Sequence, residues 1–383
     1  MSVTAAAGFR AGGATAGLKP SGRPDIALVV NDGPRHDAAA LFTANRCKAN
    51  PVLWTERAAA DGRLAAVALN SGGANCYTGP EGFQTTHATA ELVADLLDIA
   101  AIDIAVCSTG LIGELLDRPK LEDGLRKAAA ALSAHGGGDA ANAILTTDTH
   151  AKQAVVGRAG WVAGGMAKGA GMLAPALATM LVTLTTDAVA DAQTLDRALR
   201  AASRRTFDRL DADGCMSTND TVLLLASGAS EVEPSAEELT TAVTDLCDDL
   251  ARQLWADAEG AHHQIEIVVV HAAAEEEALA VARSVARSNL FKCAVFGGDP
   301  NWGRVLAAVG TTNARFDPAT VDVVINGVAV CRAGSIGERR DTVDLSGREV
   351  NVTVDLNAGP AAATILTTDL THEYVHENSA YST

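Results

Sequence analysis

The fold is decided by residues 168–187, which read KGAGMLAPALATMLVTLTTD. The first half is rich in glycine and small residues, so it predicts a loop whose backbone can approach a ligand closely. The second half, 179–186, is β-branched and apolar, which is typical of a strand buried on both faces. Lys168 stands at the loop end, and Thr179 stands where loop becomes strand. This arrangement suits a nucleophile held on a rigid element beside a cradle of backbone groups.

The composition indicates a large α/β protein. A chain of 383 residues can form two domains or one large one. Hydrophobic residues make up 48% of the chain and aromatic residues only 4%, so we expect a core of Ala, Val, Leu and Ile. A formal net charge of −17 argues against nucleic-acid and anionic-membrane partners, because no basic face is available to meet phosphates. No stretch approaches a membrane span and residues 1–25 lack a signal core, so a cytoplasmic protein is expected. The seven cysteines form no CxxC pair, and no metal is expected.

The order of elements predicts layered packing. Strands and helices mix without strict βαβ alternation, which favours layered α/β or α+β architecture. Strands are expected over 104–108 and 144–148, and a helix over 120–134 that the glycines of 136–138 end. Ser235 and Glu238 form a capping box before a long helix. The Asn326-Gly327 pair predicts a hairpin over 321–331.

Several short motifs partly match the signatures of nucleotide-binding or calcium-binding sites, but none matches in full. Residues 169–174 match G-x-G-x-x-A, yet Pro175 falls inside the helix that a dinucleotide site would need. The Walker A pattern fails because Met166 follows Gly165 where a lysine is required. Residues 211–214 look like the start of a calcium loop, but the later ligand positions are missing. The cluster DPNWGR at 299–304 is either a capped turn or a loop that shapes a site.

The central stretch closely resembles the self-cleavage segment of the ornithine acetyltransferase (glutamate N-acetyltransferase) family, and the similarity covers nearly the whole chain. DPNWGR and the EGA of 259–261 are similar to further family motifs, although His262 and His263 stand where the family usually has Thr and Lys. The resemblance implies an α-β-β-α sandwich similar to, but distinct from, the N-terminal-nucleophile hydrolases. It also implies autocatalytic cleavage between Ala178 and Thr179, which gives an α chain, 1–178, and a β chain, 179–383.

The same resemblance implies which residues form the site. Thr179 is expected to be the nucleophile, and the oxyanion donors are expected to be the Thr109 side chain and the Gly110 backbone N–H. Lys168 is expected to meet a substrate carboxylate or to stabilise charge near Thr179. The residues expected to bind substrate are Thr147, Lys168, Thr179, Glu259, Asn378 and Thr383.

The implied reaction is a ping-pong acetyl transfer. Cleavage would give Thr179 a free α-amine with a pKa of roughly 7.7–8, which suits a general base. Thr179 would take the acetyl group from N-acetylornithine and pass it to glutamate, forming N-acetylglutamate for arginine biosynthesis. No cofactor is expected, because the amide consumed and the amide formed are similar in energy. The resemblance further implies that the α and β chains associate as (αβ)₂ or a larger assembly.

Three alternatives remain open from the sequence. A bifunctional enzyme of the same fold would also use acetyl-CoA as donor. A self-cleaving aminopeptidase or amidase of related fold would use water in place of glutamate. A non-enzymatic ligand-binding or assembly protein would remain an intact chain and form no acyl-enzyme.

Overall fold

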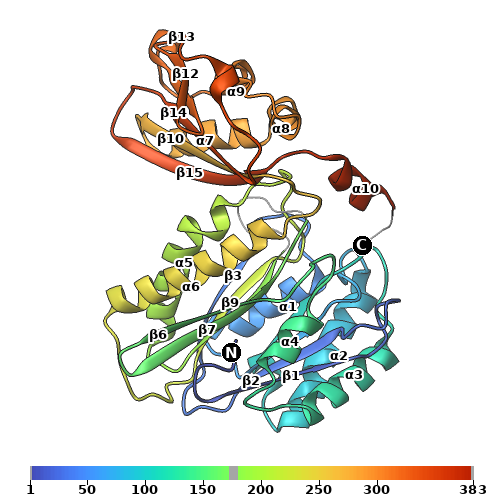
Figure 1. Cartoon of the computed structure of the whole chain (residues 1–383). Coiled ribbons are helices and arrows are strands. Elements are labelled where there is room, and N and C mark those ends of the chain that lie inside the picture. Colours follow the sequence, from blue (N-terminus) through green and yellow to red (C-terminus); the bar gives the residue numbers. More distant parts are fainter. Residues whose placement is uncertain (1, 172–179, 381–383) are drawn as a thin grey trace.

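The computed structural model describes residues 2–171 and 180–380, and these form two lobes (Figure 1). The larger lobe contains two packed sheets with helices outside them. The smaller lobe is built on a third sheet and is coloured orange to red in Figure 1. Residues 172–179 and 381–383 lie outside the described part, and with them the predicted site residues Ala178, Thr179 and Thr383.

The first sheet of the larger lobe has four strands in the order β1-β2-β4-β5. β1 pairs with β2 and β2 with β4 in antiparallel fashion, whereas β4 and β5 run parallel. Three of these strands are buried along their whole length because their sequences are continuous apolar runs. The strands are β1 (Phe9–Ala14), β2 (Ile26–Asn31), β4 (Ala66–Asn70) and β5 (Ile104–Ser108).

The second sheet has five strands in the order β3-β9-β8-β7-β6. Its centre is β8, whose six residues are all buried, as the apolar run after Thr179 predicts. β8 pairs antiparallel with β7 and parallel with β9. The strands are β3 (Asp37–Phe42), β6 (Lys152–Arg158), β7 (Trp161–Lys168), β8 (Leu181–Thr186) and β9 (Thr221–Ala226).

The two sheets pack face to face and helices cover their outer faces. Val29 and Leu69 of the first sheet share one apolar cluster with Met166 and Leu223 of the second. The other face of the second sheet packs on α5 (Ala192–Arg205) and α6 (Ala236–Ala256). The other face of the first sheet packs on α1 (Asn50–Ala58), α2 (Gly79–Leu97) and α3 (Arg118–Ala130). The predicted α-β-β-α sandwich is therefore confirmed.

The smaller lobe carries a six-stranded sheet in the order β13-β12-β11-β14-β10-β15. Its strands are β10 (Gln264–Ala272), β11 (Asp322–Ile325), β12 (Val328–Arg332), β13 (Ser335–Ile336), β14 (Glu349–Asp355) and β15 (Ala361–Thr368). Its helices are α7 (Glu275–Ala286), α8 (Asn289–Phe296) and α9 (Trp302–Val309). After β15 the chain turns back toward the larger lobe and ends in α10 (His372–Ala380) (Figure 1).

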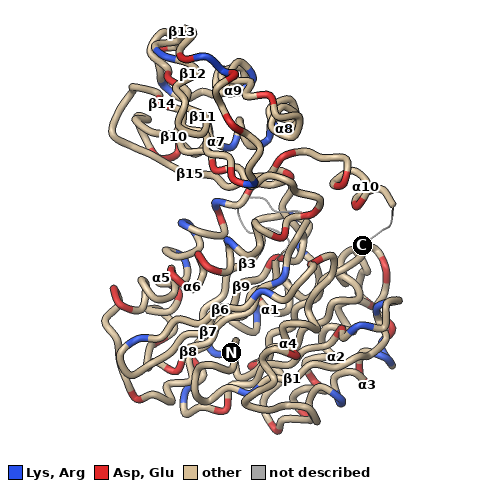
Figure 2. Tube along the Cα trace, in the orientation of Figure 1, with Lys and Arg blue, Asp and Glu red and all other residues tan. Residues whose placement is uncertain are grey.

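Short 3₁₀ helices join several of these elements. They are η1 (Ala59–Asp61), η2 (Ala101–Asp103), η3 (Phe207–Arg209), η4 (Pro318–Thr320) and η5 (Arg340–Thr342). Figure 2 shows Lys and Arg interspersed with Asp and Glu along both lobes. Within the described residues, no helix is both long and apolar enough to cross a membrane.

Three local predictions from the sequence are confirmed: a strand, a helix cap and a hairpin turn. The strand Ile104–Ser108 is confirmed as β5, and Ser235 with Glu238 forms both hydrogen bonds of a capping box. The hairpin turns at Asn326 and Gly327, which adopt φ angles of 44° and 82°. These left-handed angles are what an Asn-Gly turn requires.

Two predictions around residues 136–148 were wrong. The glycines of 136–138 do not end a helix that runs to 134: α3 stops at Ala130, and the glycines lead into a further helix, α4 (Gly137–Ala143). Ala140, Ala141 and Ala143 are fully buried in the inter-sheet core, so tertiary packing outweighs the helix-breaking tendency of glycine. Residues 144–148 are not a strand, although they are part of the site described below. β1 and α1 were not predicted at all.

Candidate active site

A polar cavity of about 150 Å³ lies where strand ends from both sheets of the sandwich meet. Thr109 and Gly110 directly follow β5, and Lys168 is the last residue of β7. Six of the predicted site residues line this cavity together: Thr109, Gly110, Thr147, Lys168, Glu259 and Asn378. The fold therefore brings together side chains that lie up to 269 positions apart in the sequence.

Gly110 has the backbone geometry of an anion-binding turn. Its φ of +129° is a conformation that side chains disfavour, and a Cβ there would lie 2.7 Å from the backbone nitrogen of Gly73. Thr109 is fixed by its own backbone, which donates to Asn70 O and accepts from Gly73 N–H, each at 3.0 Å. Within the described residues the Gly110 N–H has no acceptor. A rigid N–H without a partner beside a cavity is what an oxyanion hole needs.

Lys168 is buried, with its side chain 1% exposed. Its Nζ lies 3.5 Å from Thr109 Oγ1 and 3.8 Å from the Asp148 carboxylate. Burial lowers the pKa of Lys168 although Asp148 opposes this shift, and Lys152 lowers it further. An anionic ligand beside Lys168 would favour its charged form, which burial disfavours.

Asp148 links Lys168 to a second buried lysine. Its Oδ1 accepts from Lys152 Nζ at 2.6 Å and from the Gly169 N–H at 2.7 Å. Burial alone would raise the pKa of Asp148, but Lys168, Lys152 and these hydrogen bonds lower it to about 2. Lys152 also pairs with Asp257, so it already has two carboxylate partners. Lys168 is thus the lysine of this network whose charge is least neutralised by the protein.

Asp220 is a buried carboxyl group that contacts Met180, the residue after the predicted nucleophile. Its Oδ1 accepts from the Met180 N–H at 3.0 Å, and Met180 is covalently joined to Thr179. Its Oδ2 is buried without a partner in the described part of the chain. Burial raises the pKa of Asp220 well above its ordinary value, although the Met180 N–H and Lys168 oppose the shift. The group is therefore able to hold a proton or to pair with a cation.

Glu259 joins three segments that are distant in sequence. Its Oε1 accepts from Thr147 Oγ1 at 2.7 Å, and its Oε2 accepts from Asn378 Nδ2 at 3.0 Å. A Cβ on Gly171 would lie within 2.7 Å of the Glu259 carboxylate, so a larger residue there would displace that carboxylate from its present position. The carboxylate, which has hydrogen-bond partners on both oxygens, suits recognition of an ammonium group.

The remaining residues of the cavity were not predicted to be functional. They are Thr146, Gly171, Asp213, Cys215 and Tyr374. Asp213 lies in the stretch 211–214 that looks like the start of a calcium loop, and Cys215 directly follows it. Tyr374 precedes Asn378 by one helical turn on α10, a spacing that could have indicated it.

Two other sequence features lie outside the cavity. The DPNWGR cluster is a capped turn, because the Asn301 side chain accepts from the Arg304 N–H at the start of α9. His262 and His263 donate their backbone N–H groups to Asp369, and the His263 ring contacts Asp369 Oδ2 at 2.7 Å. The His263 side chain thus adds to the backbone contacts that hold this loop to Asp369, directly after β15. Within the described residues, no group of acidic, histidine or cysteine side chains could hold a metal ion.

A buried lysine, a free N–H at a glycine turn and a small polar cavity at the edge of an α-β-β-α sandwich define an enzyme site suited to acyl transfer. The ArgJ family model matches residues 10–383. An arginine biosynthesis bifunctional protein ArgJ from Streptomyces avermitilis is 63% identical over 382 residues, covering 100% of both chains. The protein of the same name from Thermobifida fusca is 59% identical over 383 residues, again covering 100% of both. The chain therefore belongs to the ArgJ family.

A solved structure gives a further similarity. It is an ornithine acetyltransferase from Mycobacterium tuberculosis in complex with ornithine, and it is 50% identical to this chain with a TM-score of 0.43. The match covers 47% of this chain and 96% of that chain. The family membership confirms the predicted family and the predicted class of enzyme, an acetyltransferase of arginine biosynthesis. The non-enzymatic alternative is excluded.

Proposed function

We propose that this chain cleaves itself between Ala178 and Thr179 and then transfers acetyl groups from N-acetylornithine to glutamate through acetyl-Thr179. The observation that carries the proposal is the convergence of Lys168, Thr109 and Gly110 at one cavity. The register of the sheet supports it, since Lys168 pairs with Leu181, two residues after Thr179. The products would be an α chain, 1–178, and a β chain, 179–383.

The nucleophile would be activated by its own amine. A threonine hydroxyl needs a base, and the α-amine released by cleavage has a pKa of roughly 7.7–8, near the working pH. Asp220 is the group we assign to hold this amine, because its unpartnered Oδ2 belongs to the carboxyl that accepts the Met180 N–H. This amine is released by the self-cleavage itself: the Thr179 hydroxyl attacks the Ala178 carbonyl, the Ala178–Thr179 C–N bond breaks to leave an ester and the free amine, and water then hydrolyses the ester to a carboxylate on Ala178 and the Thr179 hydroxyl.

The oxyanion formed in each acyl transfer would be bound by Gly110 N–H and Thr109 Oγ1. Gly110 N–H has no competing acceptor in the described residues, so it is free to donate at no cost to the protein. Lys168, 3.5 Å from Thr109 Oγ1, would orient that hydroxyl and add positive charge beside it. Together they stabilise charge that develops only in the transition state.

The substrate's charged ends would be held by groups of opposite sign. The Glu259 carboxylate, oriented by Thr147 and Asn378, fits the ammonium group of ornithine. Lys168 fits a substrate carboxylate, and we assign the C-terminal Thr383 to the same role as Asn378. N-acetylornithine and glutamate are therefore the proposed small-molecule partners. A cytoplasmic (αβ)₂ or larger assembly completes the proposal, and the seven free cysteines suit a reducing compartment.

Acetyl-CoA is the alternative donor, and the name "bifunctional" carried by the relatives favours testing it. Transfer from acetyl-CoA to glutamate without N-acetylornithine would establish this second activity. The aminopeptidase or amidase alternative predicts instead that N-acetylornithine is hydrolysed to free acetate without glutamate.

Intact-protein mass spectrometry before and after brief incubation with N-acetylornithine tests the proposal. We expect two fragments of roughly 18 and 21 kDa, a division of 39.2 kDa by residue count, in place of one chain. The larger fragment should gain about 42 Da as an acetyl-enzyme. Thr179→Ala should give one uncut chain that gains no acetyl group, whereas Thr342→Ala in the smaller lobe should behave as the wild type. A cut or acetylated Thr179→Ala protein would refute the assignment.

A further inference from the structure

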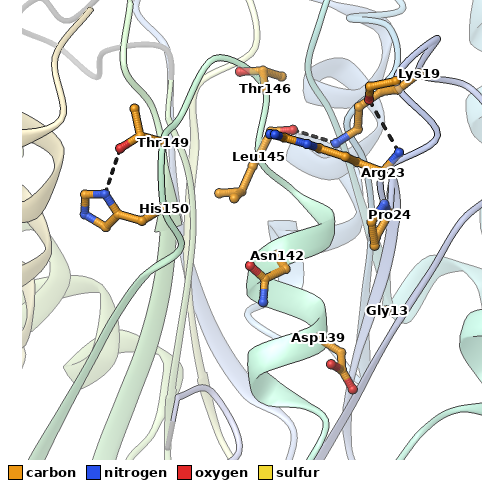
Figure 3. A pocket seen from close by; sticks show the side chains of 11 residues that line it. Gly13, Lys19, Arg23, Pro24, Asp139, Asn142, Leu145, Thr146, Thr149 and His150 are labelled. Atoms are coloured by element: carbon orange, nitrogen blue, oxygen red, sulfur yellow. Dashed lines mark hydrogen bonds between the residues drawn. The ribbon is translucent and has the colours of Figure 1, made fainter.

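A second cavity, of about 610 Å³, lies beside the proposed active site (Figure 3). Thr146 lines both cavities, so the segment around it forms their shared wall. The volume is within the range of pockets that bind small organic ligands. The proposed acetyl transfer assigns no ligand to this larger space.

Two cations, Lys19 and Arg23, line this cavity. Lys19 Nζ donates to the Leu145 carbonyl at 2.7 Å, and neither Lys19 nor Arg23 forms an ion pair within the described residues. An ammonium group has three donors, so Lys19 can serve further acceptors. Figure 3 shows both side chains reaching toward the Leu145 carbonyl. Two unpaired cations in one cavity are notable in a chain with a formal net charge of −17.

The electrostatics of Lys19 favour an anion nearby. Burial lowers the pKa of Lys19 to about 8, Asp25 opposes that shift, and Lys168 and Arg23 lower the pKa further. An anion bound between Lys19 and Arg23 would relieve this repulsion, so its binding would be favourable. The one acidic residue that lines the cavity, Asp139, is exposed and lies at the other end of the view from Lys19 (Figure 3).

Neutral polar groups complete the lining. Asn142 Nδ2 donates to Gly138 O at 2.8 Å, which leaves its second N–H available. Thr146 and His150 also line the cavity, and His150 contacts Thr149 Oγ1 at 2.9 Å. A phosphate group carries more than one negative charge and three acceptor oxygens, so it can contact both cations and a neutral donor together.

The shared wall connects this cavity to the proposed chemistry. On one side the Leu145 carbonyl accepts from Lys19, and on the other Thr147 donates to Glu259. Asp148, the residue after Thr147, binds Lys152 and lies 3.8 Å from Lys168. A ligand that engages Lys19 therefore acts on the segment that positions Glu259 and Lys168.

We infer that this cavity binds the phosphate group of a phosphate-bearing small molecule through Lys19 and Arg23. One source of that chemistry is a free phosphorylated effector. The other is the phosphorylated carrier of a thioester acyl donor, which rests on the proposed function. In that case the Thr179 hydroxyl attacks the thioester carbonyl, the C–S bond breaks, and the carrier leaves as a thiol with the hydroxyl's proton.

Binding is tested by calorimetric titration of the full chain with coenzyme A and, separately, with inorganic phosphate. Arg23→Gln and Lys19→Gln should each weaken binding about tenfold, the loss expected for one charge-assisted contact. Arg126→Gln, an exposed arginine of α3, should change it less than about twofold. The titration is repeated on Thr179→Ala, so a failure of the catalytic proposal does not alter its result.

No binding of either probe, or equal binding by the wild type and both cavity variants, would overturn the inference. If Lys19→Gln does not fold, as judged by circular dichroism, Arg23→Gln decides, because Arg23 is exposed and in no ion pair in the described part of the chain. Kinetics then separate the two sources. A carrier site requires Arg23→Gln to raise the KM for acetyl-CoA about tenfold while leaving that for N-acetylornithine unchanged. An effector site requires phosphate to change turnover of N-acetylornithine by the wild type but not by Arg23→Gln.

Discussion

The sandwich and the smaller lobe are both sheets covered by helices, yet they bury charged groups in different places. The core of the smaller lobe is an apolar cluster built from residues such as Ile267, Val323 and Val352, and the lobe's buried Lys292 lies outside this cluster and donates to the Ala212 carbonyl. The sandwich buries Lys168 and Asp220 at its strand ends, where each costs desolvation free energy. Such buried charges mark functional sites more often than structural ones. The comparison favours the proposal that the sandwich carries the chemistry and the smaller lobe supplies a scaffold.

The smaller lobe still contributes to the site through one element. β15 leads into α10, which carries Tyr374 and Asn378 to the cavity. Gly260 makes this contact possible, because its φ of +58° and the 2.2 Å distance from a Cβ to Tyr374 N exclude a side chain. Matched substitutions in the two lobes therefore test the comparison directly.

Gly110→Ala in the sandwich should have the largest effect. The new Cβ would meet the Gly73 nitrogen at 2.7 Å and displace the Gly110 N–H from its position. Loss of one oxyanion donor lowers kcat by about 100- to 1000-fold. Steady-state kinetics on folded protein measure this, with Gly347→Ala in the smaller lobe as control, since a Cβ there meets nothing within 4 Å. Equal kcat values for the two variants would contradict the role of Gly110.

Asp148 should make stability depend on acid pH. Its folded-state pKa of about 2 is below the ordinary 3.8, so its contribution is present above about pH 4 and is lost as the pH falls toward about 2. The difference corresponds to roughly 2 kcal/mol of unfolding free energy. Denaturant unfolding at several pH values should show this loss of unfolding free energy in the wild type and in the exposed-site control Asp344→Asn. Asp148→Asn should not show it. If the unfolding free energy of all three proteins falls in parallel as the pH falls, the prediction is contradicted.

Asn378→Ala should act on substrate binding. It removes the hydrogen bond to Glu259 Oε2 and leaves the carboxylate less well oriented. A hydrogen bond to a charged group is worth about 1.5–3 kcal/mol, so KM for N-acetylornithine should rise about tenfold or more. Initial-rate kinetics measure this, with the exposed Asn313→Ala of the smaller lobe as control. A change in kcat alone would assign Asn378 a different role.

Ile267→Val in the smaller lobe should have the smallest effect. Ile267 is fully buried in an apolar core, and the lost methyl group should cost about 0.5–1.5 kcal/mol of stability. Because no catalytic group lies in this cluster, kcat should stay within about twofold of the wild type. Thermal unfolding and kinetics check both values, and a large loss of kcat at unchanged stability would show that the lobe participates in catalysis.

How far the sequence predicts the structure depends on the range of the contacts involved. The capping box at Ser235 and the turn at Asn326 rest on residues at most three positions apart, so both were predictable. The α4 helix depends on burial of alanines between the sheets, a long-range effect that outweighed its glycines. The prediction of a strand over 144–148 was wrong. Ile144, at its apolar start, packs in the inter-sheet core, whereas Thr146 and Thr147 line the cavity.

The candidate site shows the same limit. Lys168 and Gly110 could be proposed because the segments carrying them resemble a known family. The hydrogen bonds of Glu259, however, span 112 and 119 positions. Lys168 reaches Asp148 because β6 and β7 pair side by side in one sheet. Such contacts depend on the tertiary fold and not on local sequence.

The strand order of the five-stranded sheet has a consequence for how the gene can be organised. A cut at Ala178–Thr179 assigns β3, β7 and β6 to one product and β9 and β8 to the other. The second product's strands are then enclosed on both sides by strands of the first. Neither product holds all five strands of this sheet, so we expect separately translated halves to associate poorly. The peptide bond between the two chains is needed only while the sheet folds. This requirement favours a gene that encodes both chains in a single reading frame.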